Sequence, residues 1–317
     1  MLAVQTMDED LLLFAGSASG KLAGEIAAYL GLRISPSEVI RFSEGNLFVR
    51  VLENVRGREV FLVQGTVFPA NDQFMELLFW IDAFKRASAA SVTALIPYFS
   101  YAKGDKKDEP RVSIRARVCA DAIEAAGVDR VITMDLHAPQ VQGFFKVPVD
   151  DLYALPVLAD EIAHRRLSNL VVVSPDAGFV KKARRFARRL GAPLAIADKQ
   201  RTDHSEHADV LDVMGDVQGC TALLVDDFIL SGGTLVEAAK ALRDRGAEAI
   251  YAAVTHGLFC GADESLIEAS PIEELFVTDT VEPAARPRGV RVLSVAPLFG
   301  EAIRRIYSRQ SISSLFD

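Results

Sequence analysis

The stretch Leu223-Leu224-Val225-Asp226-Asp227-Phe228-Ile229-Leu230-Ser231-Gly232-Gly233-Thr234 is the strongest indicator of the fold, and a helical pattern from Leu235 to Arg245 follows it. It predicts a buried strand that ends in two carboxylates, then a tight loop, then the N-terminus of a helix. Gly232 and Gly233 allow the backbone to approach a ligand closely, and the amides of a first helical turn bind anions such as phosphate. The stretch therefore indicates a strand, loop and helix unit with an anion site.

The two adjacent acids, Asp226 and Asp227, restrict the ligand that such a loop would bind. Carboxylates repel a phosphate but accept hydrogen bonds from hydroxyl groups. A sugar with hydroxyls at one end and a phosphate at the other satisfies both halves, so the stretch favours ribose 5-phosphate or phosphoribosyl diphosphate. The alternative is an ordinary strand-to-helix turn capped by Ser231, which a glycine pair alone would favour.

The composition predicts a soluble protein of two domains. The 317 residues are enough for two domains that each bury a core. No uncharged apolar run approaches the roughly 20 residues that a membrane span needs, and no secretory signal is indicated at the N-terminus, so the cytoplasm is the expected location. Cys119, Cys220 and Cys260 stand singly, which favours buried thiols over a zinc site or a disulfide framework.

The charge of the chain is acidic, with a formal net charge of −8 from 35 basic and 43 acidic residues. This balance argues against a general nucleic-acid surface, although a local cationic pocket stays open. Basic residues cluster at Lys103 to Lys107 and at Lys181 to Arg189. The second cluster is interpreted as the solvated face of a helix.

Apolar runs rich in β-branched residues alternate with segments of helical period. They predict strands near residues 11–15, 59–64, 91–96, 130–135, 170–174, 221–226, 249–254 and 273–278. This alternation indicates βαβ units and mainly parallel sheets covered on both faces. Because a single sheet would be too wide, we expect two three-layer α/β domains, with the change near Asp150 to Pro156. A last helix, Ala296 to Tyr307, follows a strand at Val290 to Ser294 and is expected to pack back on the first domain.

Two further polar groups follow predicted strands. Asp135-Leu136-His137 closes one strand, and Ser174-Pro175-Asp176 closes another. A histidine in this place ligates a metal or meets a phosphate oxygen, although a lone histidine is as often structural. Asp176 adds an oxygen ligand of the kind that Mg²⁺ accepts when it keeps several waters and bridges substrate phosphates.

Short motifs are spread in a fixed order along nearly the whole chain. They are Arg41-Phe42-Ser43, Met75-Glu76-Leu77-Leu78, Ile96-Pro97-Tyr98-Phe99, Tyr101-Ala102, Asp105-Lys106-Lys107-Asp108, Met134 to Phe145, Pro148-Val149-Asp150, Ser174-Pro175-Asp176, Val225-Asp226-Asp227, Thr255-His256-Gly257, Glu301-Ala302-Ile303-Arg304-Arg305 and Leu315-Phe316. With them the chain resembles the ribose-phosphate diphosphokinases, also called phosphoribosyl diphosphate (PRPP) synthetases. Several motifs in order are more specific than any single motif.

The resemblance implies a fold of two similar three-layer α/β/α domains of the phosphoribosyltransferase-like type, with mainly parallel sheets. It places an N-terminal domain at 8–151, completed by 294–317, and a C-terminal domain with the PRPP loop at 152–293. The implied reaction transfers the diphosphoryl group of MgATP to the C1 hydroxyl of ribose 5-phosphate, giving PRPP and AMP for nucleotide biosynthesis. The implied cofactor is Mg²⁺.

The resemblance also assigns residues to the substrates. The ribose 5-phosphate residues are Asp226, Asp227, Leu230, Ser231, Gly232, Gly233 and Thr234, the ATP residues are Phe42, Glu44, Asn46, Lys103, Gly104, Asp105 and His137, and the metal residues are His137 and Asp176. Lys199 and Arg201 would begin a mobile loop that closes over the reacting phosphates, with Lys199 as the main catalytic residue. Without the resemblance, Lys199 reads as an exposed lysine after an edge strand.

The chain departs from the family pattern mostly on the nucleotide side. Glu44-Gly45-Asn46 removes a carboxylate that relatives carry, and Lys103-Gly104 stands where Arg-Gln is usual. Lysine offers a point charge in place of a planar fork, so the diphosphoryl donor is open. Leu230, Phe179, Lys146 and Pro110 also replace common family residues. From Pro110 and Gly104 we expect phosphate activation and ADP inhibition to be weak or altered.

Three rival functions follow from the same residues. They are a catalytically silent paralogue that regulates an active partner, a phosphoribosyltransferase that consumes PRPP, and a non-enzymatic phosphosugar sensor. Retention of the acids, His137 and Lys199 disfavours the first, and motifs in the first half of the chain disfavour the second. The resemblance implies a homo-oligomer, a hexamer of dimers, with no nucleic-acid or membrane partner.

Overall fold

The computed structural model describes residues 10–200, 210–260, 264–282 and 287–316. The chain divides into two compact units. Unit 1 consists of Met1–Tyr153, Thr280–Glu282 and Ser294–Asp317, and unit 2 consists of Ala154–Asp279 and Pro283–Leu293. Each unit is an α/β structure and is described by itself.

The core of unit 1 is a sheet in which every neighbouring pair of strands is parallel. The strand order is β1-β4-β5-β6-β7. The strands are β1 (Leu11–Ala15), β4 (Glu59–Val63), β5 (Ser91–Ile96), β6 (Arg130–Met134) and β7 (Val149–Leu152). Their sequences are nearly continuous apolar runs, as expected for strands that are buried on both faces.

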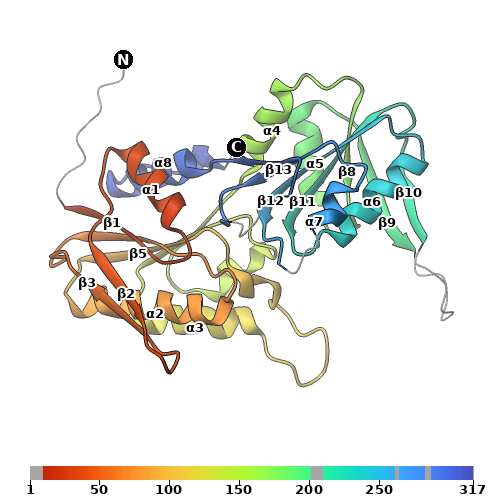
Figure 1. Cartoon of the computed structure of the whole chain (residues 1–317). Helices are drawn as coiled ribbons and strands as arrows, with labels where there is room; N and C mark the ends of the chain where they lie inside the picture. The colour runs from red at the N-terminus through yellow and green to blue at the C-terminus, as the bar shows by residue number, and fades with distance from the viewer. Residues whose placement is uncertain (1–9, 201–209, 261–263, 283–286, 317) are drawn as a thin grey trace, which may run out of the picture. The chain divides into compact units, whose positions relative to one another are not determined.

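Helices cover both faces of this sheet (Figure 1). Helices α2 (Ala70–Arg86) and α3 (Arg115–Ala126) pack on one face, where Trp80 and Phe84 join Leu12 and Phe14 in a common core. Helices α1 (Gly20–Leu30) and α8 (Ala296–Tyr307) lie together on the other face. Just before α8, the Ser294 hydroxyl donates a hydrogen bond of 2.6 Å to Glu25 on α1. The segment after 293 therefore completes the layers of unit 1.

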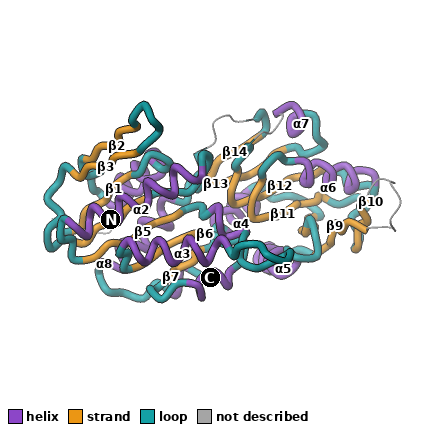
Figure 2. The backbone as a smooth tube through the Cα atoms, turned by 90° about the horizontal axis from the view of Figure 1, so that it is seen from below, coloured by secondary structure: helices purple, strands orange, loops and turns teal. Residues whose placement is uncertain are grey.

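Unit 1 also contains a two-stranded ribbon and three short 3₁₀ turns. Strands β2 (Ser37–Arg41) and β3 (Leu47–Val51) form an antiparallel ribbon that is separate from the sheet, as Figure 2 shows, and β3 contacts α2. The 3₁₀ turns are η1 (Ser100–Lys103), η2 (Pro139–Phe144) and η3 (Ser313–Leu315). Turns η1 and η2 follow β5 and β6, so they lie beyond the carboxyl ends of the parallel strands.

Unit 2 is built on a wider sheet with the order β10-β9-β8-β11-β12-β13-β14. All neighbouring pairs are parallel except β9 and β10. The strands are β8 (Leu170–Ser174), β9 (Leu194–Gln200), β10 (Val210–Met214), β11 (Thr221–Ile229), β12 (Ala249–Gly257), β13 (Glu274–Thr278) and β14 (Val290–Leu293).

The helices of unit 2 form two layers around its sheet (Figure 1). Helices α6 (Gly233–Asp244) and α7 (Glu264–Glu268) share one core with alternate strand residues such as Leu224 and Val254. Helices α4 (Leu155–His164) and α5 (Val180–Leu190) contact each other, and α5 also contacts β8 and β9. Alternate residues of a strand point to opposite faces, so both faces of this sheet are covered.

The predicted fold class is confirmed: both units consist of mainly parallel sheets between helices. One local prediction was wrong, and several strands, among them β7, β9 and β10, were not predicted. The strand expected to end at Asp226 continues to Ile229, because the apolar Phe228 and Ile229 extend its pairing with β12. The β2–β3 ribbon was not predicted, because its exposed strands lack a long apolar run. Among the helices within the described ranges, none combines the length and apolar character needed to cross a bilayer.

Candidate functional site

Three carboxylates gather at one edge of the sheet of unit 2. Strands β8 and β11 run parallel, with Val173 opposite Leu224, so their carboxyl ends lie at the same edge. Asp176 comes two residues after β8, and Asp226 and Asp227 occupy the part of β11 that extends beyond it. Asp176 is exposed, whereas Asp227 is buried with 4% of its surface accessible. The three acids therefore lie at the same edge of the sheet in unit 2.

The charge on Asp226 is unfavourable in this setting. Burial raises the pKa of the Asp226 carboxyl well above its usual range, and the neighbouring charges of Asp227 and Asp176 act in the same direction. The Asp226 Oδ1 atom accepts a hydrogen bond of 2.8 Å from the backbone N–H of Asp227, which partly offsets this effect. Hydroxyl donors or a cation at this edge would lower the energy of the paired acids.

Lys182 on α5 supplies one such cation. Its Nζ atom lies 3.4 Å from Oδ2 of Asp227 and 5.4 Å from the centre of the Phe179 ring. The backbone N–H of Phe179 in turn donates a hydrogen bond of 2.8 Å to Oδ1 of Asp176. The start of α5 thus contacts both acidic segments.

The loop between β11 and α6 has the form of an anion site. Gly232 adopts the left-handed conformation (φ 87°, ψ −10°) and is the N-cap of α6, which begins at Gly233. No side chain caps this helix end within the described residues, so capping by Ser231 was a wrong alternative. The left-handed conformation favours glycine here, and a Cβ atom on Gly232 would crowd the Ile267 side chain at 3.1 Å. The first-turn amides of α6 stay available to an anion.

The other residues predicted for this loop lie at its surface. Leu230 is 44% exposed, and Ser231 and Thr234 are also exposed. Thr234 is the second residue of α6. The loop therefore combines an exposed rim with a buried glycine, and only Phe228 and Ile229 separate it from the acid pair.

In unit 1, two predicted nucleotide segments come together after β5 and β6. Asp105 follows η1, and its Oδ2 atom accepts a hydrogen bond of 2.5 Å from Gln140 on η2. His137 is exposed and precedes η2 by two residues. Lys103 is the last residue of η1. These contacts bring the Lys103–Asp105 segment close to the segment that carries His137.

The surroundings of Gly104 explain why this position has no side chain. A Cβ atom at this position would lie 2.7 Å from Nε and 2.9 Å from Cβ of Arg115. The Gly104 carbonyl also accepts a hydrogen bond of 3.1 Å from the N–H of Ala116 on α3. A larger residue would have to displace Arg115, so the glycine that departs from the family pattern fits its surroundings.

Phe42, Glu44 and Asn46 lie in the turn of the β2–β3 ribbon. The N–H of Phe42 donates a hydrogen bond of 2.9 Å to the carbonyl of Asn46, which closes the turn. The Phe42 ring is 44% exposed and lies 6.4 Å from the ring of Phe48. Glu44 is exposed as well. The turn therefore presents an aromatic ring and a carboxylate to its surroundings.

The remaining predicted residues are placed less completely. Lys199 lies in β9, and its backbone is opposite Leu211 of β10. It is therefore part of a strand rather than the first residue of a loop. Arg201 lies outside the described residues, as does most of the predicted lid. His137 belongs to unit 1 and Asp176 to unit 2, and each is described within its own unit.

Comparison with known proteins covers almost the whole chain. A family model described as the N-terminal domain of ribose phosphate pyrophosphokinase matches residues 11–127, and one described as the phosphoribosyl synthetase-associated domain matches residues 204–317. A ribose-phosphate pyrophosphokinase of Caldanaerobacter subterraneus is 50% identical over 309 residues, covering 96% of this chain and 98% of that protein. The chain belongs to the ribose-phosphate pyrophosphokinase family. The predicted family resemblance is thereby confirmed.

Other ribose-phosphate pyrophosphokinases agree with this assignment. The protein from Wolinella succinogenes is 47% identical, covering 96% of this chain and 98% of its own. Among solved structures, phosphoribosylpyrophosphate synthetase from Mycobacterium smegmatis superposes with a TM-score of 0.89 at 39% identity, covering 95% of this chain and 100% of that one. The similarity thus extends over both units.

The metal expected for a ribose-phosphate pyrophosphokinase fits the donors in unit 2. Asp176, Asp226 and Asp227 offer hard oxygen ligands whose mutual repulsion a divalent cation would offset. No group of three or more side chains of the metal-binding kinds is arranged as a cage in the described ranges. Mg²⁺ is held in many phosphate sites by one or two carboxylates together with substrate phosphates and water.

Sequence reasoning missed Lys182. The run Lys181 to Arg189 was interpreted as a solvated helix face, but the Lys182 side chain is only 22% exposed and pairs with Asp227. No signal in the sequence indicates this pair, because Lys182 and Asp227 are 45 positions apart. The interpretation as a solvated face is therefore wrong for this residue.

Proposed function

We propose that the chain carries out the reaction of its family, the transfer of the diphosphoryl group of MgATP to the C1 hydroxyl of ribose 5-phosphate. The sugar oxygen forms a bond to the β-phosphorus, the bond from that phosphorus to the α,β-bridging oxygen breaks, and AMP leaves. The observation that carries the proposal is the acid pair on β11, followed by a helix N-terminus with a left-handed glycine. Family membership over 96% of the chain supports the same reaction.

Ribose 5-phosphate would bind at the carboxyl edge of unit 2. Asp226 and Asp227 accept hydrogen bonds from the ring hydroxyls, which donate to carboxylates. The 5-phosphate lies against the amides of the α6 N-terminus, with Leu230, Ser231, Gly232, Gly233 and Thr234 around it. The raised pKa of Asp226 supports this reading, because hydroxyl donors would compensate a buried pair of like charges.

ATP would use the residues of unit 1. Phe42 offers its exposed ring to the adenine, Glu44 and Asn46 border it, and the Lys103–Asp105 segment with His137 meets the phosphates. Lysine in place of the family arginine still attracts phosphate as a point charge. The contact of Asp105 with Gln140 supports a common role for these two segments.

Mg²⁺ would be held by Asp176 in unit 2 together with the diphosphate, and His137 in unit 1 stays a candidate metal ligand. When bound, it neutralises charge on the transferred group. The chain's own task in the transfer is to position two anionic reactants, and Lys199 and Arg201 would supply the cations that oppose the charge developing on the phosphates. Support for Lys199 is its place on β9, which neighbours the strand β8 that leads to Asp176.

The setting of the enzyme is also part of the proposal. Domains at 8–151 with 294–317 and at 152–293 are supported by the two compact units and by α8 on α1. We place the enzyme in the cytoplasm, as a homo-oligomer built as a hexamer of dimers. The β2–β3 ribbon, with Val39, Phe42 and Phe48 partly exposed, supports contact with another copy there.

A single assay tests the proposed function. The purified chain is incubated with MgATP and ribose 5-phosphate, and AMP and PRPP are followed by chromatography. We expect both products in equal amounts. Pyrophosphate release from PRPP and a base would instead identify a phosphoribosyltransferase, and silence in both assays would identify a regulatory paralogue or a sensor. Repeating the assay with other nucleotides at fixed ribose 5-phosphate identifies the preferred donor.

A further inference from the structure

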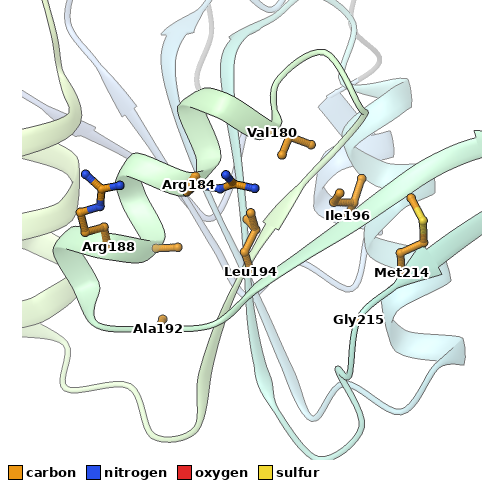
Figure 3. A pocket seen from close by; sticks show the side chains of 9 residues that line it. Val180, Arg184, Arg188, Ala192, Leu194, Ile196, Met214 and Gly215 are labelled. Carbon is orange, nitrogen blue, oxygen red and sulfur yellow. The ribbon is translucent and has the colours of Figure 1, made fainter.

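A groove on unit 2 lies outside the residues assigned to the substrates. It has a volume of about 580 Å³. It lies between α5, the first residues of β9 and the last residue of β10. The lining residues are Val180, Arg184, Ala187, Arg188, Ala192, Leu194, Ile196, Met214 and Gly215. Figure 3 shows that α5 borders one side and that β9 and the end of β10 form the other. The volume lies within the roughly 300–1,000 Å³ of small-molecule sites.

Two guanidinium groups stand on the helix side of this groove. Arg184 and Arg188 are exposed and four residues apart on α5, so they share one helix face. Neither makes an ion pair or a side-chain hydrogen bond within the described part of the chain, whereas Lys182 pairs with Asp227 and Arg189 with Asp160 on the same helix. Like charges at this spacing destabilise a helix unless an anion lies between them.

Two acids that flank the lining residues Met214 and Gly215 in the sequence, Asp212 and Asp216, are engaged elsewhere. Asp212 on β10 pairs with Arg245 at 2.5 Å. Asp216 accepts a hydrogen bond of 3.2 Å from the N–H of Gln218 and does not line the groove. Arg188 is in the last turn of α5, where its positive charge interacts favourably with the helix dipole. Arg184 is in the middle of the helix and has no such interaction.

The opposite side of the groove is apolar. Leu194 and Ile196 on β9 are partly exposed, and Met214 on β10 is 49% exposed. Small residues, Ala187 and Ala192, leave room beside them. An occupant would therefore place an apolar or aromatic body on these side chains and an anionic group between the two arginines.

We propose that this groove binds an organic phosphate whose phosphate group is attached to a flat apolar moiety. Two guanidinium groups carry two positive charges, which match the charge of about −2 on a phosphate monoester near neutral pH. Arginine recognises phosphate through several charge-assisted hydrogen bonds, and methionine adapts to flat apolar groups. The site is distinct from the Asp226–Thr234 loop, and its occupation need not depend on the proposed reaction.

The test uses 1-naphthyl phosphate as the probe and isothermal titration calorimetry of the full chain. Ribose 5-phosphate is present at saturation, so that the phosphate loop of unit 2 is filled. We expect one probe molecule per chain. Arg184→Gln and Arg188→Gln should each weaken binding about tenfold, because each removes a charge-assisted hydrogen bond. The matched control is Lys181→Gln, which removes the same charge from an exposed position outside the groove and should change the affinity less than twofold.

Further variants distinguish the contribution of the phosphate group from that of the apolar part of the ligand. Met214→Ser should weaken binding of naphthyl phosphate severalfold and leave inorganic phosphate unaffected, whereas Arg184→Gln should weaken both. Thermal unfolding of each variant should match the unaltered chain, since surface substitutions of this kind are close to neutral.

Three outcomes would overturn the proposal. The probe does not bind at millimolar concentration, or the variant that carries both Arg184→Gln and Arg188→Gln binds it as tightly as the unaltered chain. The third is that Lys181→Gln weakens binding as much as the arginine substitutions do. Light scattering decides a further alternative. If Arg184→Glu lowers the oligomeric mass and naphthyl phosphate never binds, the groove is covered by a second copy of the chain.

Discussion

Lys182 and Asp227 form an ion pair of 3.4 Å between α5 and β11 at the acidic edge of unit 2. The carboxylate is buried, with 4% of its side chain exposed, and the lysine is only 22% exposed. Removing one partner of such a pair leaves a charge with poor solvation. Lys182 therefore positions Asp227 and sets the charge balance among the three acids.

We predict that Lys182→Met raises the KM for ribose 5-phosphate about tenfold or more, with a smaller effect on kcat, because Asp227 loses the cation that orients it. Stability should fall by about 1–3 kcal/mol, less than for a fully buried pair. Steady-state kinetics and denaturant unfolding measure the two effects. Lys182→Arg should restore most of the sugar affinity, and Lys181→Met should match the unaltered chain. An unchanged KM in Lys182→Met would remove Lys182 from this role.

Asp226→Asn should stabilise the chain while it impairs sugar binding. The folded state raises the Asp226 pKa by burial and by repulsion from Asp227, so ionisation at this position opposes folding. The stability gain should be absent below the ordinary Asp pKa of about 4, grow as the pH rises, and be complete above the raised pKa. Thermal melts from pH 4 to pH 8 measure it. A variant that is less stable at pH 8 contradicts the prediction.

Gly232→Ala should weaken ribose 5-phosphate binding and destabilise unit 2. The left-handed conformation costs roughly 1–2 kcal/mol for alanine, and the new methyl group would meet Ile267 at 3.1 Å. Gly233→Ala is the matched comparison, because Gly233 is helical and a Cβ there meets only Ser231 at 3.8 Å. Its stability should be equal or higher. Equal melting temperatures for the two variants would show that the turn tolerates a side chain.

Lys199→Ala should lower turnover by orders of magnitude with little change in sugar binding, since Lys199 is proposed to act on the charge that develops during transfer. Single-turnover kinetics with MgATP and a separate binding titration with ribose 5-phosphate distinguish the two effects. Near-normal turnover in this variant would transfer the catalytic role to another residue.

Thiol reactivity should separate Cys119 from Cys260. Burial raises the pKa of the Cys119 thiol to about 11, and its side chain lies in the core with 7% exposed. Cys260 is exposed. Alkylation with iodoacetamide at pH 8 followed by mass spectrometry should label Cys260 and leave Cys119 unmodified until the chain unfolds, because the thiolate is the reactive species. Early labelling of Cys119 would indicate that α3 opens readily.

The alternation of apolar and helical segments predicted the architecture well, because parallel strands buried on both faces are continuous apolar runs. The bounds of α8 were predicted for a different reason, since its apolar residues recur at the helical period. The β2–β3 ribbon escaped prediction because its two strands are half-exposed and form none of the buried apolar runs on which the other strands were predicted.

The candidate site was predictable where neighbouring residues in the sequence carry the chemistry, as with the Asp226-Asp227 pair and the glycine loop. It was less predictable where chemistry depends on contacts between segments. The pairing of Lys182 with Asp227 joins residues that are 45 positions apart. The basic run on α5 gave no sign of which charges face solvent, because period alone does not reveal what packs against a helix.

Helix α8 has a consequence for biosynthesis. Unit 1 begins with the first strand of the chain, yet Phe299 and Ile303 of α8 are fully buried in it and α8 packs on α1. During synthesis, the core of unit 1 cannot be completed until residues 294–316 have left the ribosome. By then unit 2 is already synthesised. A fusion partner or a stop codon placed near residue 294 would therefore expose the apolar face of the half that is made first, and chaperones or proteases would meet it.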